Sequence, residues 1–245
     1  MTARRPRVRI VGLGRAGLSF LGALDRVGWT VVDGLGRDAD KHGAAGGVDL
    51  VLICTPDHAI AAVADEIAPG DAVVAHVAGS LGLDVLGRHA RRAGIHPLNS
   101  LPDGQIGADR LLDNGWFAVA GDAVANELVE ELGGRSFVVA DADRPVYHAA
   151  ACIAANHVVA LLGQVERLAA GIGVPAEAYV ELCRAPVDNV ARLGAASALT
   201  GPAARGDDMT IARHLEHLPL DERRVYEVMA AEARRLATRT QHSDS

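Results

Sequence analysis

The chain contains few lysines, cysteines and aromatic residues. Among its 245 residues, 24 are Lys or Arg, three are Cys and 3% are aromatic. Lys41 is the single lysine, so any chemistry that requires a lysine has to use it. The cysteines, Cys54, Cys152 and Cys183, are far apart and form no C-x-x-C pair, which indicates neither a disulfide framework nor a zinc site. We therefore expect a reducing, cytoplasmic location.

The chain also has no net positive charge and no long apolar run. Its formal net charge is −7, so we expect no nucleic-acid partner bound through neutralised phosphates. No stretch reaches the roughly 20 uninterrupted apolar residues of a membrane span, and we expect no membrane partner. With 49% apolar and 22% charged residues, the composition fits a globular protein of one large or two modest domains.

A glycine-rich turn follows the first apolar segment, Arg7–Val11, and opens a segment with leucines at helical spacing. A second apolar segment, Trp29–Val32, completes a βαβ unit. In this context the pattern G-x-G-x-x-G is typical of a dinucleotide site, where the helix N-terminus faces a pyrophosphate. The turn residues, which we expect to contact the cofactor, are Gly12, Leu13, Gly14, Arg15, Ala16 and Gly17.

Two residues near the end of the second strand compete to select the nucleotide. An acidic residue such as Asp33 binds a ribose 2'-hydroxyl, whereas an arginine such as Arg37 accepts a 2'-phosphate. Arg37 lies nearer the usual offset, about twenty residues after the turn. We therefore predict NADP rather than NAD as the cofactor, with Asp33 as a solvated carboxylate.

Further strands are predicted at three apolar segments. The continuous run Asp49–Cys54 is typical of a strand buried on both faces of a parallel sheet. Ala72–Val77 and Gly94–His96 precede polar loops that should open on one crevice at the carboxyl edge of the sheet. At the end of the Asp49–Cys54 strand we assign Cys54, Thr55 and Pro56 to cofactor binding. At the ends of the other two strands we assign Ser80 and His96 to catalysis.

Strand signals end near Asp143. Trp116–Ala120 and Ser136–Val139 are expected to be the last strands, and about Val146–Ala170 one long apolar helix. The sequence thus predicts an α/β fold. A doubly wound, mostly parallel Rossmann sheet in residues 1–142 is followed by a smaller all-α domain for substrate binding and dimerisation in residues 143–245.

Five motifs link the chain to a known group: Gly12–Gly17, His76–Ser80, His96–Leu98, Tyr147–Asn156 and Leu199–Asp207. On these motifs the chain resembles Rossmann-like NAD(P)-dependent oxidoreductases with an all-helical C-terminal domain of unknown function. They belong to the group of 6-phosphogluconate dehydrogenase, ketopantoate reductase and pyrroline-5-carboxylate reductase. The resemblance implies a nicotinamide cofactor, hydride transfer at a cleft between the domains, and a ketopantoate-like substrate as one option.

The chain departs from the ketopantoate reductases at their catalytic lysine. Their corresponding helix carries that lysine with asparagines one and two turns later, whereas this chain has His148, Cys152 and Asn156 at those positions. We predict that His148 donates the proton and that Asn156 hydrogen-bonds the developing charge. The alternative is that His148 is a structural histidine at an interface.

The C-terminal half adds candidate substrate contacts. Arg205 could hold a carboxylate through two hydrogen bonds, with Thr200 of the same motif beside it. The alternative for Arg205 is an ion pair with Asp207 or Asp208. His214 and His217 lack a third ligand, so we assign no metal.

The prediction is an NADP-dependent oxidoreductase acting on a small carboxylated 2-oxo acid or imine. Loss of the lysine favours the alternative, a non-catalytic NADP-binding protein with a regulatory or redox-sensing role. The helical half is rich in Ala and Leu and has more apolar surface than its own core can bury, which predicts a homodimer through the C-terminal helices.

Overall fold

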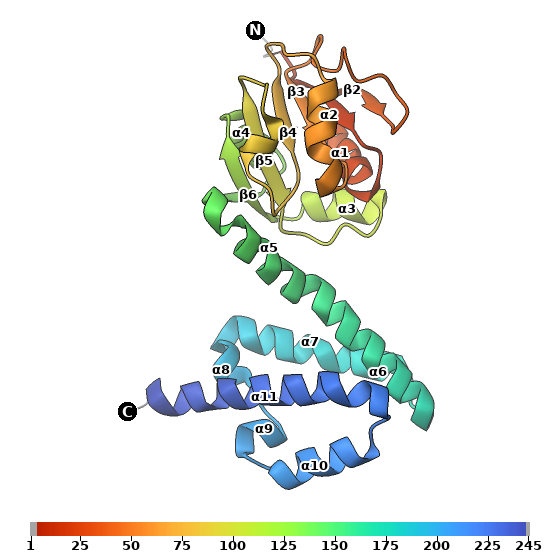
Figure 1. Ribbon diagram of the computed structural model, residues 1–245, viewed down its shortest axis with the longest axis vertical. Helices are drawn as coiled ribbons and strands as arrows, with labels where there is room; N and C mark the ends of the chain where they lie inside the picture. Colours follow the sequence, from red (N-terminus) through yellow and green to blue (C-terminus); the bar gives the residue numbers. More distant parts are fainter. Residues whose placement is uncertain (1–3, 244–245) are drawn as a thin grey trace. The chain divides into compact units, whose positions relative to one another are not determined.

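The protein is described by a computed structural model that covers residues 4–243. The chain forms two compact units, Met1–Asn156 and His157–Ser245 (Figure 1). The first is an α/β unit and the second is helical, so the predicted fold class is confirmed. The predicted boundary at residue 142 falls earlier than this division, because the helix after residue 143 contacts the sheet unit through Tyr147 and His148.

A seven-stranded sheet in the order β2-β1-β3-β4-β5-β6-β7 forms the centre of the first unit. All neighbouring strands are parallel except β5 and β6. The chain leaves β1 for β2 on one side and then returns to β3 on the other, which creates a switch point at the carboxyl ends of β1 and β3. The strands are β1 (Arg7–Val11), β2 (Thr30–Leu35), β3 (Leu50–Ile53), β4 (Val73–His76), β5 (Arg92–Pro97), β6 (Trp116–Gly121) and β7 (Arg135–Val138).

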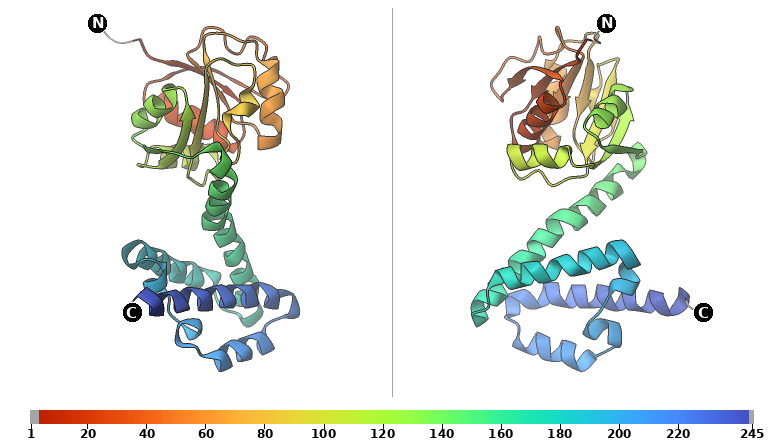
Figure 2. Two further views of the ribbon diagram at one scale, coloured as in Figure 1. Left: turned by 60° about the vertical axis from the view of Figure 1, so that its left-hand side comes forward. Right: turned by 180° about the vertical axis from the view of Figure 1, so that it is seen from behind.

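Two cores lie on opposite faces of this sheet, and helices cover both faces (Figure 2). All four residues of β3 are buried; Leu50 and Leu52 face one core, whereas Val51 and Ile53 face the other. This explains the uninterrupted apolar run of β3, since both of its faces are covered. The first core includes α1 (Arg15–Arg26), α3 (Gly104–Leu111) and α4 (Val124–Glu131); the second includes α2 (Ile60–Glu66) and the 3-10 turn η2 (Leu83–Leu86).

A run of helix follows β7. It comprises the 3-10 turn η3 (Asp141–Asp143), α5 (Arg144–Cys152), the π-helical turn η4 (Ile153–His157) and α6 (Val158–Ile172). The predicted single helix is therefore interrupted by a π-helical turn, a feature that recurs at functional sites. Asp141–Ile172 is the one stretch in residues 4–243 long and apolar enough to cross a membrane, by length and composition alone. Its first turns nevertheless pack on the sheet, where Arg144 is fully buried.

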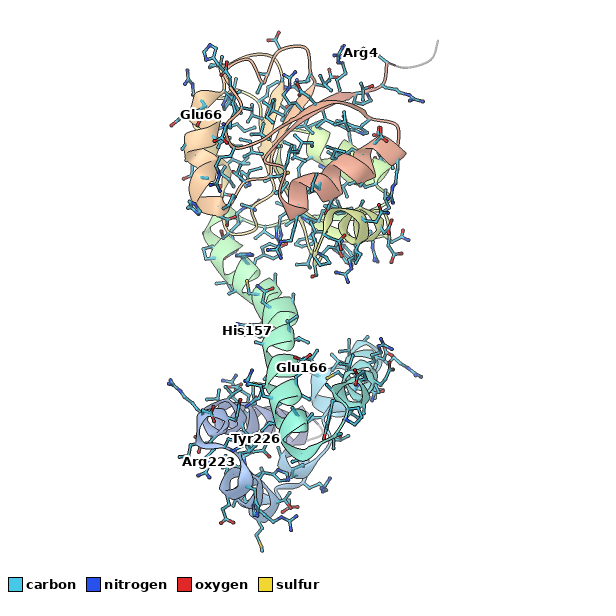
Figure 3. The ribbon with its side chains drawn as sticks, turned by 90° about the vertical axis from the view of Figure 1, so that its right-hand side faces the viewer. Arg4, Glu66, His157, Glu166, Arg223 and Tyr226 are labelled. Carbon is cyan, nitrogen blue, oxygen red and sulfur yellow. The ribbon has the colours of Figure 1, made fainter. Side chains whose placement is uncertain are left out.

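The second unit is all helical and has a thin core. After α6 it contains α7 (Ala176–Leu193), α8 (Ala195–Ala198), α9 (Pro202–Arg205), α10 (Asp208–His217) and α11 (Leu220–Ser243). Of its described apolar residues, Ala169 and Ile211 are buried. Polar contacts join α6 to α11: Arg167 forms a two-contact ion pair with Glu222, at 2.5 and 3.0 Å. Figure 3 marks His157, where this unit begins, and Tyr226 on α11.

Candidate functional site

The glycine turn between β1 and α1 has the geometry of a pyrophosphate cradle. Gly12 has φ +98°, and a Cβ there would lie 2.9 Å from the Cys54 carbonyl group, so only glycine fits. Above Gly14 there is open space, with no atom within 4 Å of an added Cβ. No side chain caps α1, which leaves the N–H groups of its first turn free to bind an anion. The turn therefore fits a dinucleotide.

The segment after β2 lies beside this turn. The N–H of Gly12 donates to the Leu35 carbonyl (2.8 Å), which brings the following Gly36–Arg37 turn alongside. Arg37 is exposed, as binding a 2'-phosphate requires. Asp33 lies inside the edge strand β2 and is exposed to solvent, as predicted; it also forms an ion pair with Arg9 (2.5 Å).

Lys41 supports the same segment. Its buried ammonium donates to the carbonyl oxygens of Arg37 and Ala39 and to the Glu66 carboxylate, each at 3.0 Å. The three donors of the ammonium are thus matched by three acceptors. The single lysine holds the Arg37 turn in place and has no N–H left for catalysis.

The residues after β3 lie at the carboxyl edge of the sheet, next to the glycine turn. Cys54 is buried in the core, and burial raises the pKa of its thiol, so its side chain stays protonated. Thr55 lies against the glycine turn, and its buried hydroxyl oxygen makes no hydrogen bond to any residue in the described range. A buried hydroxyl without a partner is costly unless a ligand satisfies it. Pro56 is exposed beside it.

His76 organises the loop after β4. Its Nδ1 accepts a hydrogen bond from the N–H of Ala78 (3.2 Å), and its Nε2 donates to the Gly82 carbonyl (3.1 Å). The ring is therefore neutral, and burial lowers its pKa. His76 ties together both ends of the loop that carries Ser80. We did not predict it as a site residue, although its position directly before the loop was a usable signal.

Ser80 is engaged within the protein. Its hydroxyl donates to Asp57 Oδ2 (2.6 Å) from the 3-10 turn η1 (Asp57–Ala59). In this arrangement the Ser80 oxygen can accept a hydrogen bond but has no proton to offer a developing negative charge. Asp57, one residue after Pro56, thus orients Ser80.

His96 and His148 meet over Gly79. A Cβ added to Gly79 would lie 2.8 Å from atoms of both rings, so glycine is needed for their approach. The ring centroids are 5.8 Å apart and the planes are perpendicular. His148 also has its Nε2 3.9 Å from the Cys152 sulfur, one helical turn later. The structure thus brings together His148, His96 and the Ser80 loop, as the strand order led us to expect.

Two neighbours on α5 modify the environment of His96. Tyr147 Oη lies 2.6 Å from His96 Nδ1. Burial, the adjacent His148 and the charge of Arg144 lower the pKa of His96 to about 4, so His96 is neutral at pH 7. Arg144 pairs through Nε with Asp141 (3.1 Å), while its two terminal nitrogens are buried without a partner among the described residues. The sequence analysis assigned no role to Tyr147 or Arg144.

The other predicted residues are not part of this cluster. Asn156 is exposed in the π-helical turn at the end of the first unit. Thr200 and Arg205 are exposed residues of the second unit. Neither alternative partner binds Arg205 in an ion pair, because Asp207 caps α10 through Thr210 and Asp208 pairs with Arg234. In the described part of the chain, no group of three His, Cys, Asp or Glu residues is placed to hold a metal.

Comparison with known protein families identifies part of the chain. Residues 118–233 match the model of a domain of unknown function, DUF2520, which therefore begins in β6 and extends through most of α11. No curated protein matches the sequence.

Solved structures share the fold along almost the whole chain. A "putative NADP oxidoreductase" from Bacteroides fragilis has TM-score 0.81 at 19% identity, covering 94% of this chain and 98% of its own. Protein TM1727 from Thermotoga maritima has TM-score 0.72 at 24% identity, covering 96% and 99%. Pyrroline carboxylate reductase from Plasmodium falciparum, solved with NADP bound, has TM-score 0.62 at 11% identity, covering 95% and 98%.

At these identities the likeness establishes the fold, and the family model identifies the C-terminal part. The chain therefore has the Rossmann-type fold of NAD(P)-dependent oxidoreductases, with a DUF2520 region that forms its last strands and its helical half.

Proposed function

We propose that this protein is an NADP-dependent oxidoreductase that acts on a small carboxylated 2-oxo acid or imine. The observation that carries the proposal is the meeting of His148 and His96 over Gly79. This cluster lies at the carboxyl edge of the same sheet as the glycine turn, where ligands of open α/β sheets bind. When bound, the nicotinamide supplies or accepts the hydride.

The residues of the chain then have separate tasks. His148 gives a proton to the substrate oxygen or nitrogen as negative charge builds there. Asn156, two turns further on and about 12 Å along the helix, binds a more distant polar group of an elongated substrate. Ser80, held by Asp57, accepts a hydrogen bond from an N–H of the ligand. Thr200 and Arg205 of the second unit remain the proposed carboxylate-binding residues.

Arg37 tests the choice of cofactor. A charge-assisted contact to a 2'-phosphate contributes roughly 1.5 to 3 kcal/mol, so NADPH should bind at least about tenfold more tightly than NADH. Arg37→Ala should remove most of this preference, whereas Arg224→Ala, which changes an exposed arginine of α11, should not. An unchanged ratio of the two dissociation constants in Arg37→Ala would refute the NADP assignment.

Turnover tests the activity itself. NADPH oxidation should be followed over a panel of 2-oxo acids and cyclic imines, with product identified by mass spectrometry. His148→Gln should lower turnover by roughly 100-fold while leaving NADPH binding intact, because the acid is lost and the glycine turn is unaffected. If NADPH binds but no panel member is reduced, the non-catalytic NADP-binding alternative replaces this proposal. The engagement of Lys41 away from the site is the observation that favours that alternative.

We also propose that two copies pair through the helical unit. Large apolar side chains on α7 and α11 are exposed, including Leu182 at 63%, Val187 at 64% and Val228 at 56%. Exposed apolar side chains of this size mark an interaction site when they form a contiguous surface. A second copy brings an equivalent apolar face, so a symmetric dimer would cover both. A membrane is the competing occupant, and the oligomeric state of the wild type together with its binding to lipid vesicles separates the two.

A further inference from the structure

His96 holds one ring nitrogen inside the protein and directs the other toward the site. Its Nδ1 is bonded to Tyr147 Oη at 2.6 Å. Its Nε2 lies 2.8 Å from the position that a Cβ on Gly79 would occupy, and the His148 ring lies equally close to that position. No residue in the described range forms a hydrogen bond with this Nε2. The free nitrogen is therefore the one that a substrate would meet.

The chemistry of the two groups favours the Tyr147 hydroxyl as the donor in this contact. N–H···O bonds cluster near 2.9–3.0 Å, whereas bonds from O–H donors are shorter. The phenol oxygen is also a poor acceptor because its lone pair is delocalised into the ring. Burial raises the pKa of Tyr147 to about 12, so the phenol keeps its proton. Tyr147 therefore donates to Nδ1 of His96, and a neutral imidazole that accepts at Nδ1 carries its hydrogen on Nε2.

The surroundings keep His96 in this neutral form. Arg144 and His148 face it from α5 and His76 from β4, and all three disfavour a second proton on the ring. Asp57 is the one acidic group that acts in the opposite direction. Burial is the largest contribution and acts in the same direction as Arg144 and the two histidines. His96 is thus a hydrogen-bond donor at neutral pH, but not an acid.

We propose that Tyr147 is a positioning residue that fixes His96 as a neutral Nε2–H donor beside His148, and that this pair of donors selects a carbonyl substrate over an imine. This inference rests on the proposed function, because it assigns a second donor to the same site. A carbonyl oxygen has two lone pairs and can accept from both histidines, whereas an imine nitrogen has one. With ring centroids 5.8 Å apart, one acceptor atom can lie within hydrogen-bond reach of both rings.

The tautomer can be measured without turnover. In ¹⁵N-labelled protein, long-range ¹H–¹⁵N spectra distinguish protonated from unprotonated ring nitrogens, and His96→Gln assigns the signals. We expect wild-type His96 to show a protonated Nε2 and an unprotonated Nδ1. In Tyr147→Phe, which keeps the ring contact with Phe137, we expect a mixture of both tautomers. A wild-type His96 protonated at Nδ1, or one unaffected by Tyr147→Phe, overturns the proposal.

The chain provides a matched control for this experiment. Tyr226 lies 2.6 Å from Nδ1 of His214 with the same edge-on ring geometry, but in the second unit (Figure 3). Tyr226→Phe should therefore change the His214 signals and leave those of His96, and the turnover, as in the wild type. If Tyr226→Phe also changed the His96 signals or the turnover, the effect of Tyr147→Phe would be a general one of removing a tyrosine hydroxyl.

Substrate preference tests the second half of the inference. Wild type should reduce a 2-oxo acid with a higher kcat/KM than a cyclic imine of similar size, and Tyr147→Phe should lower this ratio about tenfold without changing the Kd of NADPH. An imine preference in the wild type overturns the carbonyl assignment even if the tautomer is as expected. Absence of all turnover with NADPH bound refutes the proposed function instead, and the tautomer measurement still decides the role of Tyr147.

Discussion

The two units of this chain, Met1–Asn156 and His157–Ser245, differ greatly in their cores. In the first unit, two continuous apolar cores fill both faces of the sheet. In the second, Ala169 and Ile211 are the buried apolar residues of the described part, while large apolar side chains on α7 and α11 are exposed. A unit with so little buried apolar surface gains little stability on its own. The first unit thus has the core of an independent domain, whereas the second leaves large apolar side chains exposed.

The largest expected effect tests the stability of the first unit. Leu52→Ala removes a fully buried side chain from β3 and should cost about 2–5 kcal/mol in the free energy of unfolding. Leu182→Ala is the matched change on α7, where the side chain is 63% exposed, and its intrinsic cost in dilute protein should stay within about 0.5 kcal/mol. Urea unfolding at low protein concentration measures both. Equal costs would contradict the contrast between the two units.

The next effect concerns the site that the first unit holds in place. Gly79→Ala should lower kcat/KM by about 100-fold, because its Cβ displaces the rings of His96 and His148. Gly79 has no positive φ, so alanine causes no backbone strain there. Gly43→Ala, which meets no atom within 4 Å, is the control and should have wild-type activity. NADPH binding should be unchanged in both variants; normal turnover in Gly79→Ala would remove the case for this cluster.

Acid should destabilise the first unit more than the second. His96 has a folded pKa of about 4, below its ordinary value of 6.5, so the unfolded chain binds the proton more readily between these values. The stability that this histidine contributes is therefore complete above pH 6.5 and is lost as the pH falls to about 4. The loss should be about 3 kcal/mol, with buried His76 acting in the same direction.

Urea titrations from pH 7 to pH 4 measure this loss, and His96→Gln should reduce it. The described histidines of the second unit are exposed, so its unfolding should depend less on pH in this range. A pH-independent stability of the first unit would contradict the neutral state of His96.

The smallest expected effect is on assembly. Val187→Asp places a charge on the exposed apolar face of α7 and should weaken the proposed dimer at least tenfold, about 1.4 kcal/mol. Asp188→Ala, one residue away and also exposed, should leave the dimer intact. Light scattering across a dilution series measures both variants. A monomeric wild type that binds lipid vesicles would replace the dimer with a membrane as the occupant of this face.

The sequence predicted the strands well because each combines an apolar run with a flanking turn. It missed α3, whose segment contains Gly104 and Gly107 and shows no apolar period. That helix forms because Asp103 caps it and because Gly107 permits close contact with Ser19 of α1. Its stability therefore comes from tertiary packing, which a local pattern does not contain.

Prediction of the site was limited in the same way. His148 and His96 were found because both stand next to recognisable motifs. The contact between His96 and Tyr147 joins residues 51 positions apart, and the bond from Ser80 to Asp57 spans 23. Such partners depend on the register of strands and the rotation of α5, so no local pattern indicates them. The Ser80 hydroxyl, predicted as a donor, is for this reason already used within the protein.

The engagement of Lys41 has a practical consequence for chemical labelling. The other residues counted as Lys or Arg are all arginines, and their guanidinium groups do not react with acylating reagents as amines do. The one side-chain amine is 6% exposed and is bound to the turn that carries Arg37. Acylation of Lys41 should therefore require that turn to open. The labelling rate of Lys41, followed by mass spectrometry, would therefore measure how often the Arg37 turn opens. A bound dinucleotide that contacts Arg37 should lower this rate.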